Sequence, residues 1–343
     1  MKRLADREVR IFLKDAERRQ ACLESSSEQL HRLLEARVKT GLLVSPLPQL
    51  YARTELWDQL DQTMRTAHLA RGLQELHPSW VFCGTTAAVM HGLDVSWHIQ
   101  DPLEISSRSG RAKTASPHVV RRYVSGDEPV EMNGVRVTTL SRTLLDCMRR
   151  LEFREALAVV DSALHQGLID SERLLSYVSG GRRGMAGMER VRNIAQMADP
   201  RPENGMESIA RALMYELGFV APELQVPFSD PMNPRKTYYV DYCWTLSDGS
   251  LVIGELDGGE KYRNPLMNGG SPEAKMRKER RRESRISIGR PAIVRFSPEE
   301  VRDVSYFNQL LETFGVPKDH EPIIDIPAGP VSETVPLSAY GLE

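Results

Sequence analysis

Three carboxylates stand close together in the chain at positions 241, 255 and 257, and residues of this type can hold a divalent metal ion. Carboxylates that approach one another repel, whereas Mg²⁺ (or Mn²⁺) bound through one or two of them and through water removes that repulsion. Glu255 also lies in the almost continuous apolar run from Val252 to Leu256, where a charge needs a partner. We therefore predict a metal site with Asp241, Glu255 and Asp257 as ligands. The alternative is a set of solvated charges on an exposed face.

A turn between two apolar runs decides where these carboxylates lie. The runs flank Ser247-Asp248-Gly249, a pattern typical of a β-hairpin. If only Asp248-Gly249 form the loop, Asp241 faces Leu256 and Glu255 lies on the opposite face of the sheet. If all three residues form the loop, with Gly249 left-handed in a bulge, Asp241 faces Glu255 and Asp257 joins the same face. The sequence leaves both registers open, and only the second assembles the site.

Hydrolysis of a phosphodiester needs further groups beside such a metal, above all a cation that stabilises charge on the phosphate. Lys261 follows the carboxylates directly and is the expected cation. An earlier apolar helix is expected to begin at Asn204, and Glu207 follows Asn204 at the spacing of a capping box. Glu207 can therefore cap that helix or pair with Arg211, one turn further on. The alternative for Glu207 is a place near the metal. The expected catalytic set is therefore Asp241, Glu255, Asp257, Lys261 and Glu207.

A short basic segment supplies the local electrostatic case for DNA as a partner. Within eleven residues seven bases stand against only two acids, although the whole chain has a net charge of -2. The bases are Lys275, Arg277, Lys278, Arg280, Arg281, Arg282 and Arg285. We expect a helix that contacts DNA phosphates, because this excess of bases exceeds what pairing along a helix would use. The alternative is an ordinary solvated helix face.

The elements before this region predict two further modules. Residues 3 to 40 have the apolar spacing of two helices, and two short strands with a turn follow from Leu42 to Tyr51. This order fits a winged helix-turn-helix, and a helical hairpin used for packing fits equally well. Short strands are then expected near 103–106, 119–124 and 135–138, with helices at 140–151 and 154–166, and Gly167 ends the second helix. A break at 199–202 follows.

These patterns divide the chain into four parts. We expect a helical, possibly winged-helix domain at 1–75, a mixed α+β domain at 76–200, the carboxylate-bearing domain at 201–316, and a disordered, acidic and Pro-rich tail at 317–343. The overall fold class is α/β (α+β). No apolar run approaches a membrane span and the charged start lacks a signal-peptide core, so no membrane is expected and a cytoplasmic location follows. The four cysteines are isolated, which indicates buried thiols.

With these residues in hand, the segment from Pro202 to about Val304 resembles the PD-(D/E)XK nuclease superfamily, more closely its branch similar to very-short-patch-repair endonucleases. The matching stretches are Glu207-Ser-Ile-Ala-Arg211, Val240-Asp241-Tyr242, Gly254-Glu255-Leu-Asp257-Gly258, Glu260-Lys261-Tyr262, and the Arg-rich helix that leads to Val294-Arg295-Phe296. The resemblance implies a mixed sheet flanked by helices, with Asp241 and Glu255 as metal ligands and Glu207 as an auxiliary carboxylate. The superfamily usually has a lysine where this chain has Asp257, so Lys261 would have to replace it or Asp257 would serve as another ligand or base.

The first two thirds of the chain resemble an abortive-infection antitoxin class. The markers are Gly41-Leu-Leu-Val44 with Tyr51, the stretch from Gly84 to Gly92, and the stretch from Thr138 to Asp146. The resemblance implies a winged DNA-binding start, a role in phage defence, and a cognate toxin as a partner. Arg142 and Asp146, four apart on one helix, are more often a structural ion pair than a site, and His91 is interpreted as a helix-end residue.

Two functions follow as expectations. The first is a Mg²⁺-dependent DNA endonuclease whose N-terminal modules help to select its DNA. The second is a catalytically inactive, antitoxin-like DNA-binding regulator that keeps the nuclease fold as a platform. A pure protein-interaction module fits the carboxylate spacing least well.

Overall fold

The computed structural model describes residues 6–108, 117–180, 186–257 and 272–324. They form two compact units, Met1–Pro200 and Arg201–Glu343, each of which is described by itself. The division falls inside the Asp199-Pro200-Arg201-Pro202 stretch where the sequence predicts a break. Helices and mixed sheets occur in the described residues, which confirms the α+β fold class.

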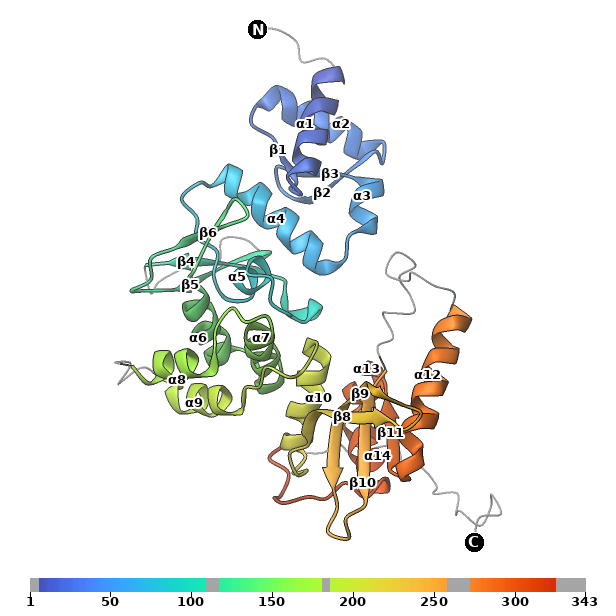
Figure 1. The fold of residues 1–343 in the computed structure, drawn as a ribbon. Helices are drawn as coiled ribbons and strands as arrows, with labels where there is room; N and C mark the ends of the chain where they lie inside the picture. Colours follow the sequence, from blue (N-terminus) through green and yellow to red (C-terminus); the bar gives the residue numbers. More distant parts are fainter. Residues whose placement is uncertain (1–5, 109–116, 181–185, 258–271, 325–343) are drawn as a thin grey trace. The chain divides into compact units, whose positions relative to one another are not determined.

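Unit 1 begins with two helices on a three-stranded antiparallel sheet of order β1-β3-β2 (Figure 1). The elements are α1 (Asp6–Arg18), β1 (Leu23–Glu24), α2 (Glu28–Lys39), β2 (Leu43–Leu47) and β3 (Leu50–Arg53). The expected pair of helices and the hairpin after Gly41 are thus confirmed. Val9, Leu34 and Tyr51 bury the helices against the sheet. β1 lies between the two helices in the chain and pairs with β3, so both helices belong to one helix-and-sheet module.

The rest of unit 1 combines short strands with a group of helices. Its elements are α3 (Thr54–Gln59), α4 (Gln62–Leu76), α5 (Gly84–Met90), η1 (Trp97–Ile99), β4 (Leu103–Ser107), β5 (Val119–Tyr123), β6 (Val130–Met132), β7 (Val135–Val137), α6 (Leu140–Arg150), α7 (Phe153–His165), α8 (Ser171–Ser179) and α9 (Met188–Met197). The predicted strands and helices are present, and Gly167 after α7 has a φ of 65°. The sequence pattern did not predict β6 and α8.

One buried cluster crosses the boundary expected at 75/76. Cys22 and Leu50 from the N-terminal elements pack in the same cluster as Phe82 and Ile105. Residues 1–75 and 76–200 therefore share a core, and the structure groups them in one unit. Their separation in the sequence pattern reflects a change of secondary structure and not a gap between two cores.

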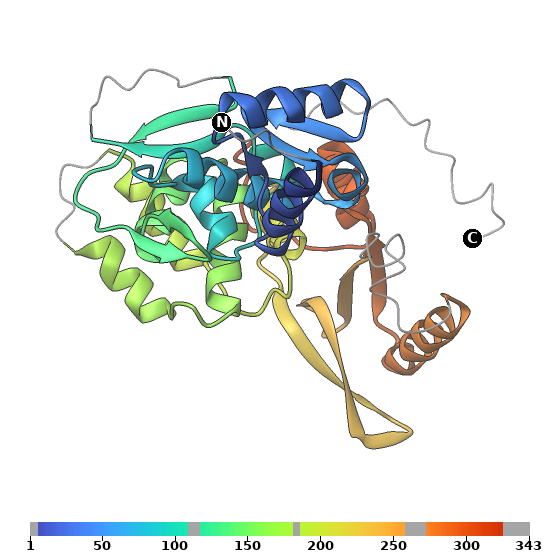
Figure 2. The same ribbon diagram turned by 90° about the horizontal axis from the view of Figure 1, so that it is seen from above.

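Unit 2 is built on a four-stranded mixed sheet of order β11-β10-β9-β8. Its elements are α10 (Gly205–Glu216), β8 (Glu223–Asp230), β9 (Asn233–Thr245), β10 (Leu251–Leu256), α12 (Pro272–Ile286), η3 (Ser287–Gly289), β11 (Ala292–Phe296), α13 (Pro298–Arg302) and α14 (Val304–Thr313). β8, β9 and β10 are antiparallel, and β11 runs parallel to β10. Figure 2 shows β8 and β9 as a long twisted ribbon.

Helices cover the sheet of unit 2 on both faces. On one face Tyr242 and Trp244 pack in a cluster with Leu213 of α10 and Phe307 of α14. On the other face Ile286 of α12 packs in a cluster with residues of β9 and β10. The alternation of side chains along β9 and β10 therefore points odd-numbered residues from 241 to 255, including both carboxylates, to the face that α12 covers.

The beginning of the expected tail is ordered. The N–H of Val220 donates to the carbonyl of Pro317, and the N–H of Ile323 donates to the carbonyl of Glu216. The ring of His320 lies 5.0 Å from that of Tyr215. Residues 317–324 thus pack against the end of α10, and the expectation of disorder from residue 317 is wrong for this stretch; the remainder of the tail lies outside the described residues.

Candidate active site

The hairpin β9–β10 has the register that assembles the carboxylates. Leu251 pairs with Thr245 and Gly254 with Tyr242, so the next position of this register sets Glu255 beside Asp241. The N–H of Leu246 donates to the carbonyl of Ser250, which leaves a three-residue loop, and Gly249 has a φ of 81°. The three-residue loop with its left-handed glycine is confirmed.

Asp241 is held at the sheet by a backbone donor. Its Oδ2 accepts the N–H of Leu256 at 2.8 Å. Burial raises the pKa of the Asp241 carboxyl, while that N–H and the guanidinium of Arg282 act in the opposite direction. Asp241 is therefore a poorly solvated carboxylate.

Glu255 has a stronger partner, which comes from α12. The Nη1 of Arg282 donates to Oε2 of Glu255 at 2.6 Å and its Nη2 donates to Oε1 at 2.8 Å. The same Nη2 donates to the carbonyl of Tyr239 at 2.5 Å. Burial raises the pKa of Glu255, and the bonds from Arg282 oppose that rise. A bidentate contact between an arginine and a carboxylate is among the stronger polar interactions in proteins.

Glu207 is buried at the start of α10, where its oxygens serve the helix terminus. Oε2 accepts the N–H of Glu203 at 2.7 Å and Oε1 accepts the side-chain amide of Asn204 at 2.5 Å. Asn204 in turn accepts the N–H groups of Met206 and Glu207 as the N-cap. These contacts agree with the capping alternative for Glu207.

Gln225 is the residue of this region that the sequence did not single out. It lies on β8, where its two chain neighbours pair with the residues on either side of Asp241. Its φ of 51° is in the left-handed region that residues other than glycine rarely adopt. Its Nε2 lies 3.4 Å from Oε2 of Glu207 and 3.5 Å from Oδ1 of Asp241. These distances are long for hydrogen bonds, so Gln225 spans the space between the two carboxylates. A glutamine within a strand carries no sequence signal for this role.

Asp257 does not complete a three-carboxylate cluster. Its Oδ1 pairs with Nη1 of Arg295 at 3.1 Å, and its side chain is 53% exposed. In the ranges that the structure describes, no group of three or more His, Cys, Asp or Glu residues is placed to hold a metal ion. Of the three expected ligands, Asp241 and Glu255 are the two that the hairpin register brings together.

That pair fits a Mg²⁺ ion by the chemistry of its donors. Mg²⁺ is usually held by one or two protein carboxylates and keeps several waters. Asp241 and Glu255 are in register and lie in surroundings that raise the pKa of both. The guanidinium of Arg282 against Glu255 is a cation that already stands at this position. Asp241 and Glu255 are the residues that would hold the metal.

The basic helix is present, and most of its described bases face solvent. Arg277, Lys278, Arg280 and Arg281 are exposed, and Arg285 is half-buried. Arg282 differs from the expectation, because its guanidinium points to the carboxylate site instead of to solvent. Lys261 lies outside the described residues, as does the side chain of Lys275.

Unit 1 contains a second, buried set of charges around α5. Arg122 pairs with Glu104 at 2.5 Å, and Arg142 pairs with Asp146 at 3.0 Å. Arg150 lies 3.4 Å from the same oxygen of Asp146. Each of these carboxylates has a cationic partner, as buried charges require. The expected ion pair of Arg142 with Asp146 is confirmed.

His91 and the cysteines have structural positions. His91 ends α5, and its Nε2 lies 2.9 Å from the carbonyl of Thr138, as expected for a helix-end residue. The cysteines are all buried and free, which confirms their interpretation as buried thiols.

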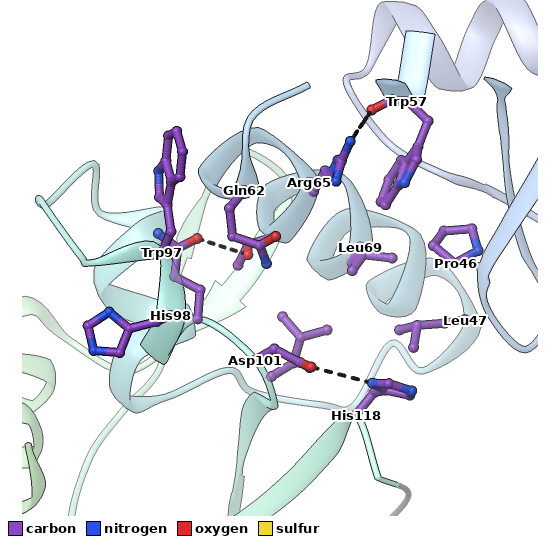
Figure 3. Close-up of a pocket in the computed structure, with 13 residues that line it drawn as sticks. Pro46, Leu47, Trp57, Gln62, Arg65, Leu69, Trp97, His98, Asp101 and His118 are labelled. Carbon is purple, nitrogen blue, oxygen red and sulfur yellow. Dashed lines mark hydrogen bonds and ion pairs between the residues drawn. The ribbon is translucent and has the colours of Figure 1, made fainter. Parts of the chain in front are cut away.

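A pocket of about 350 Å³ opens on unit 1 beside β2 and α4 (Figure 3). Leu47, Leu69 and Pro46 form its apolar part, with Trp57 and Trp97 at its sides. The polar groups around it are engaged with one another: Arg65 donates to the carbonyl of Trp57 at 3.0 Å, and His118 lies 3.6 Å from Asp101.

No helix in the part of the chain that the structure describes is long and apolar enough to span a membrane.

Comparisons with known proteins add relatives without a described activity. No family model matches the chain. Two proteins from two strains of Mycobacterium tuberculosis, both described as uncharacterized, are 30% identical to it over 168 residues. The matched segment covers 48% of this chain and 58% of the length of each relative. The functional argument therefore depends on the geometry of the site.

Proposed function

We propose that unit 2 is a Mg²⁺-dependent (or Mn²⁺-dependent) nuclease domain that hydrolyses phosphodiester bonds in DNA, in a cytoplasmic protein with a role in phage defence. The observation that carries the proposal is the register of the β9–β10 hairpin, which, continued one position beyond Gly254 and Tyr242, sets Asp241 beside Glu255 under the basic helix α12. The mixed sheet flanked by helices is the architecture that the nuclease resemblance implies.

The chain's own residues divide the work of such a reaction. Asp241 and Glu255 would hold the metal, which when bound lowers the pKa of its water and polarises the phosphate. The exposed bases of α12, which include Lys278, Arg280 and Arg281, would bind the DNA backbone and set its position on the face of the sheet. The β2–β3 hairpin, acting as a wing, and the helices α1 and α2 would contribute a second DNA contact.

The direct test is cleavage of supercoiled, linear double-stranded and single-stranded DNA by the full chain with Mg²⁺ or Mn²⁺. We expect nicking or cutting that Asp241→Ala and Glu255→Ala each abolish. Glu223→Ala, a change at an exposed carboxylate on β8, is the matched control and should retain cleavage. Cleavage that persists unchanged in both site variants would refute the assignment of the site.

A second candidate is a catalytically inactive DNA-binding regulator with a cognate toxin as partner. Two observations favour it: Arg282 takes both oxygens of Glu255, and Asp257, at the position of the usual lysine, pairs with Arg295. This candidate is distinguished by DNA binding that weakens steeply with salt, without any hydrolysis in the presence of metal.

A further inference from the structure

We infer that Arg282 is the resident cation of the metal-free site, and that a divalent ion binds Glu255 only in exchange for it. The inference rests on the proposed function, since it concerns the same two carboxylates. It adds a residue to the site, because Arg282 belongs by sequence to the DNA-binding set of α12.

The contacts of Arg282 exclude a metal ion from the same oxygens. Its two Nη atoms stand 2.6 and 2.8 Å from Oε2 and Oε1 of Glu255. A Mg²⁺ ion bound to these oxygens would lie about 2.0 to 2.1 Å from them. On the side of the carboxylate that Arg282 occupies, the ion would take the space in which the guanidinium nitrogens lie, and the two positive charges would repel. Arg282 and a divalent ion therefore compete for that side of Glu255.

The burial of Glu255 explains why a cation, either Arg282 or a divalent ion, has to lie beside it. The side chain of Glu255 is 9% exposed and that of Arg282 is 18% exposed. Asp241 lies beside Glu255 in the hairpin register, so without a cation two poorly solvated negative charges would face each other. Arg282 neutralises one of them, whereas a divalent ion would neutralise both. Exchange is thus compatible with the charge of the site.

Arg295, the other guanidinium near Glu255, pairs with other carboxylates. Arg295 pairs in register with Glu255 across β11, but its Nη1 lies 3.1 Å from Asp257 and its Nη2 lies 3.8 Å from Glu283. Arg282 is the guanidinium for which the structure gives direct contacts to Glu255.

The position of Arg282 on α12 also indicates where it goes when a metal displaces it. Lys278 is four residues before it and Arg285 three residues after it, which places the three bases on one side of the helix. A released Arg282 joins these bases, and a DNA phosphate would favour that released position. Metal and DNA would then each strengthen the binding of the other, because such coupling is reciprocal.

Calorimetric titration of the full chain with Mn²⁺ alone, at a pH well above the ordinary carboxyl range, tests the exchange. Arg282→Gln removes the competing charge and is expected to bind Mn²⁺ about tenfold or more tightly than the unmodified chain, since hydrogen bonds between charged groups are typically worth that much. Arg281→Gln is the matched control, because it makes the same charge change at an exposed position of the same helix. It should bind within about twofold of the unmodified chain, as screened surface charges have small effects.

Arg282→Lys provides a second variant that keeps the charge near Glu255 but loses the two parallel bonds. An affinity between those of the unmodified chain and Arg282→Gln is expected, and this variant decides the matter if Arg282→Gln does not fold. Equal or weaker Mn²⁺ binding when Arg282 is replaced would overturn the exchange and leave the metal site of the proposed function in place. No Mn²⁺ binding by any of the proteins would overturn both.

Discussion

Asp241→Asn separates the metal-binding role of this residue from its structural one. The amide has nearly the same shape, and its oxygen can still accept the N–H of Leu256, which Asp241 accepts at 2.8 Å. In the absence of metal we therefore expect little change in the thermal midpoint of unit 2. The variant lacks the negative charge that a divalent ion requires, so its response to metal should disappear.

The expected size of that response follows from binding linkage. A ligand at ten times its dissociation constant stabilises the folded state by about 1.4 kcal/mol. Unit 2 extends from Arg201 to Glu343, and for domains of this size such a gain raises the midpoint by roughly 3 to 6 °C. We expect Mg²⁺ or Mn²⁺ to produce a shift of this order in the unmodified chain and none in Asp241→Asn.

Scanning calorimetry of the full chain with and without metal measures this shift. Glu223→Gln, which removes an exposed carboxylate from β8, should retain it. A metal-dependent shift that survives in Asp241→Asn, or that is lost in Glu223→Gln, would contradict the assignment of Asp241 as a ligand.

Three further predictions concern both units. Gly84 has a φ of 54°, and a Cβ there would lie 1.6 Å from a buried carboxylate oxygen; Gly84→Ala should lower the unfolding free energy of unit 1 by about 3 to 5 kcal/mol. Gly134→Ala, with a φ of 79° and open space around it, should cost only about 1 to 2 kcal/mol in the same denaturant titration, and equal losses would contradict this reasoning. Replacing Arg280 and Arg281 together by Gln should weaken DNA binding and reduce the slope of its salt dependence by about one unit for each phosphate that the variant no longer binds; an unchanged slope would remove α12 from the DNA surface. Burial lowers the pKa of His68 below its ordinary 6.5, so the neutral form is favoured on folding, and its contribution to stability is present above pH 6.5 and lost as the pH falls through the folded-state pKa. His68→Asn should flatten that decline in unfolding experiments, and a decline as steep as in the unmodified chain would show that other groups cause it.

The hairpin shows how far local sequence reaches. Ser247-Asp248-Gly249 favours a small number of turns, and each turn sets a different register. The period of two along a strand then converts the register into a choice of face. The sequence could therefore state the condition for bringing Asp241 and Glu255 together, and the three-residue loop in the structure meets it.

The contacts across the sheet show where local sequence stops. Arg282 has the same side chain as its exposed neighbours Arg280 and Arg281, and the helix pattern alone does not tell which base points inward. Its contact with Glu255 depends on how α12 packs on the sheet, through Ile286. Gln225 likewise faces Asp241 only because β8 pairs with β9 in this register.

Local spacing by itself determined many of the strands and helices, the break near Pro200, and the small choice of turns for the hairpin, because turn chemistry and apolar periodicity act over a few residues. Tertiary packing decided that Asp257 pairs with Arg295 and that Arg282 lies on Glu255. These outcomes join residues up to 38 positions apart, and the physical reason is that the partner of a buried charge is set by which elements meet in space.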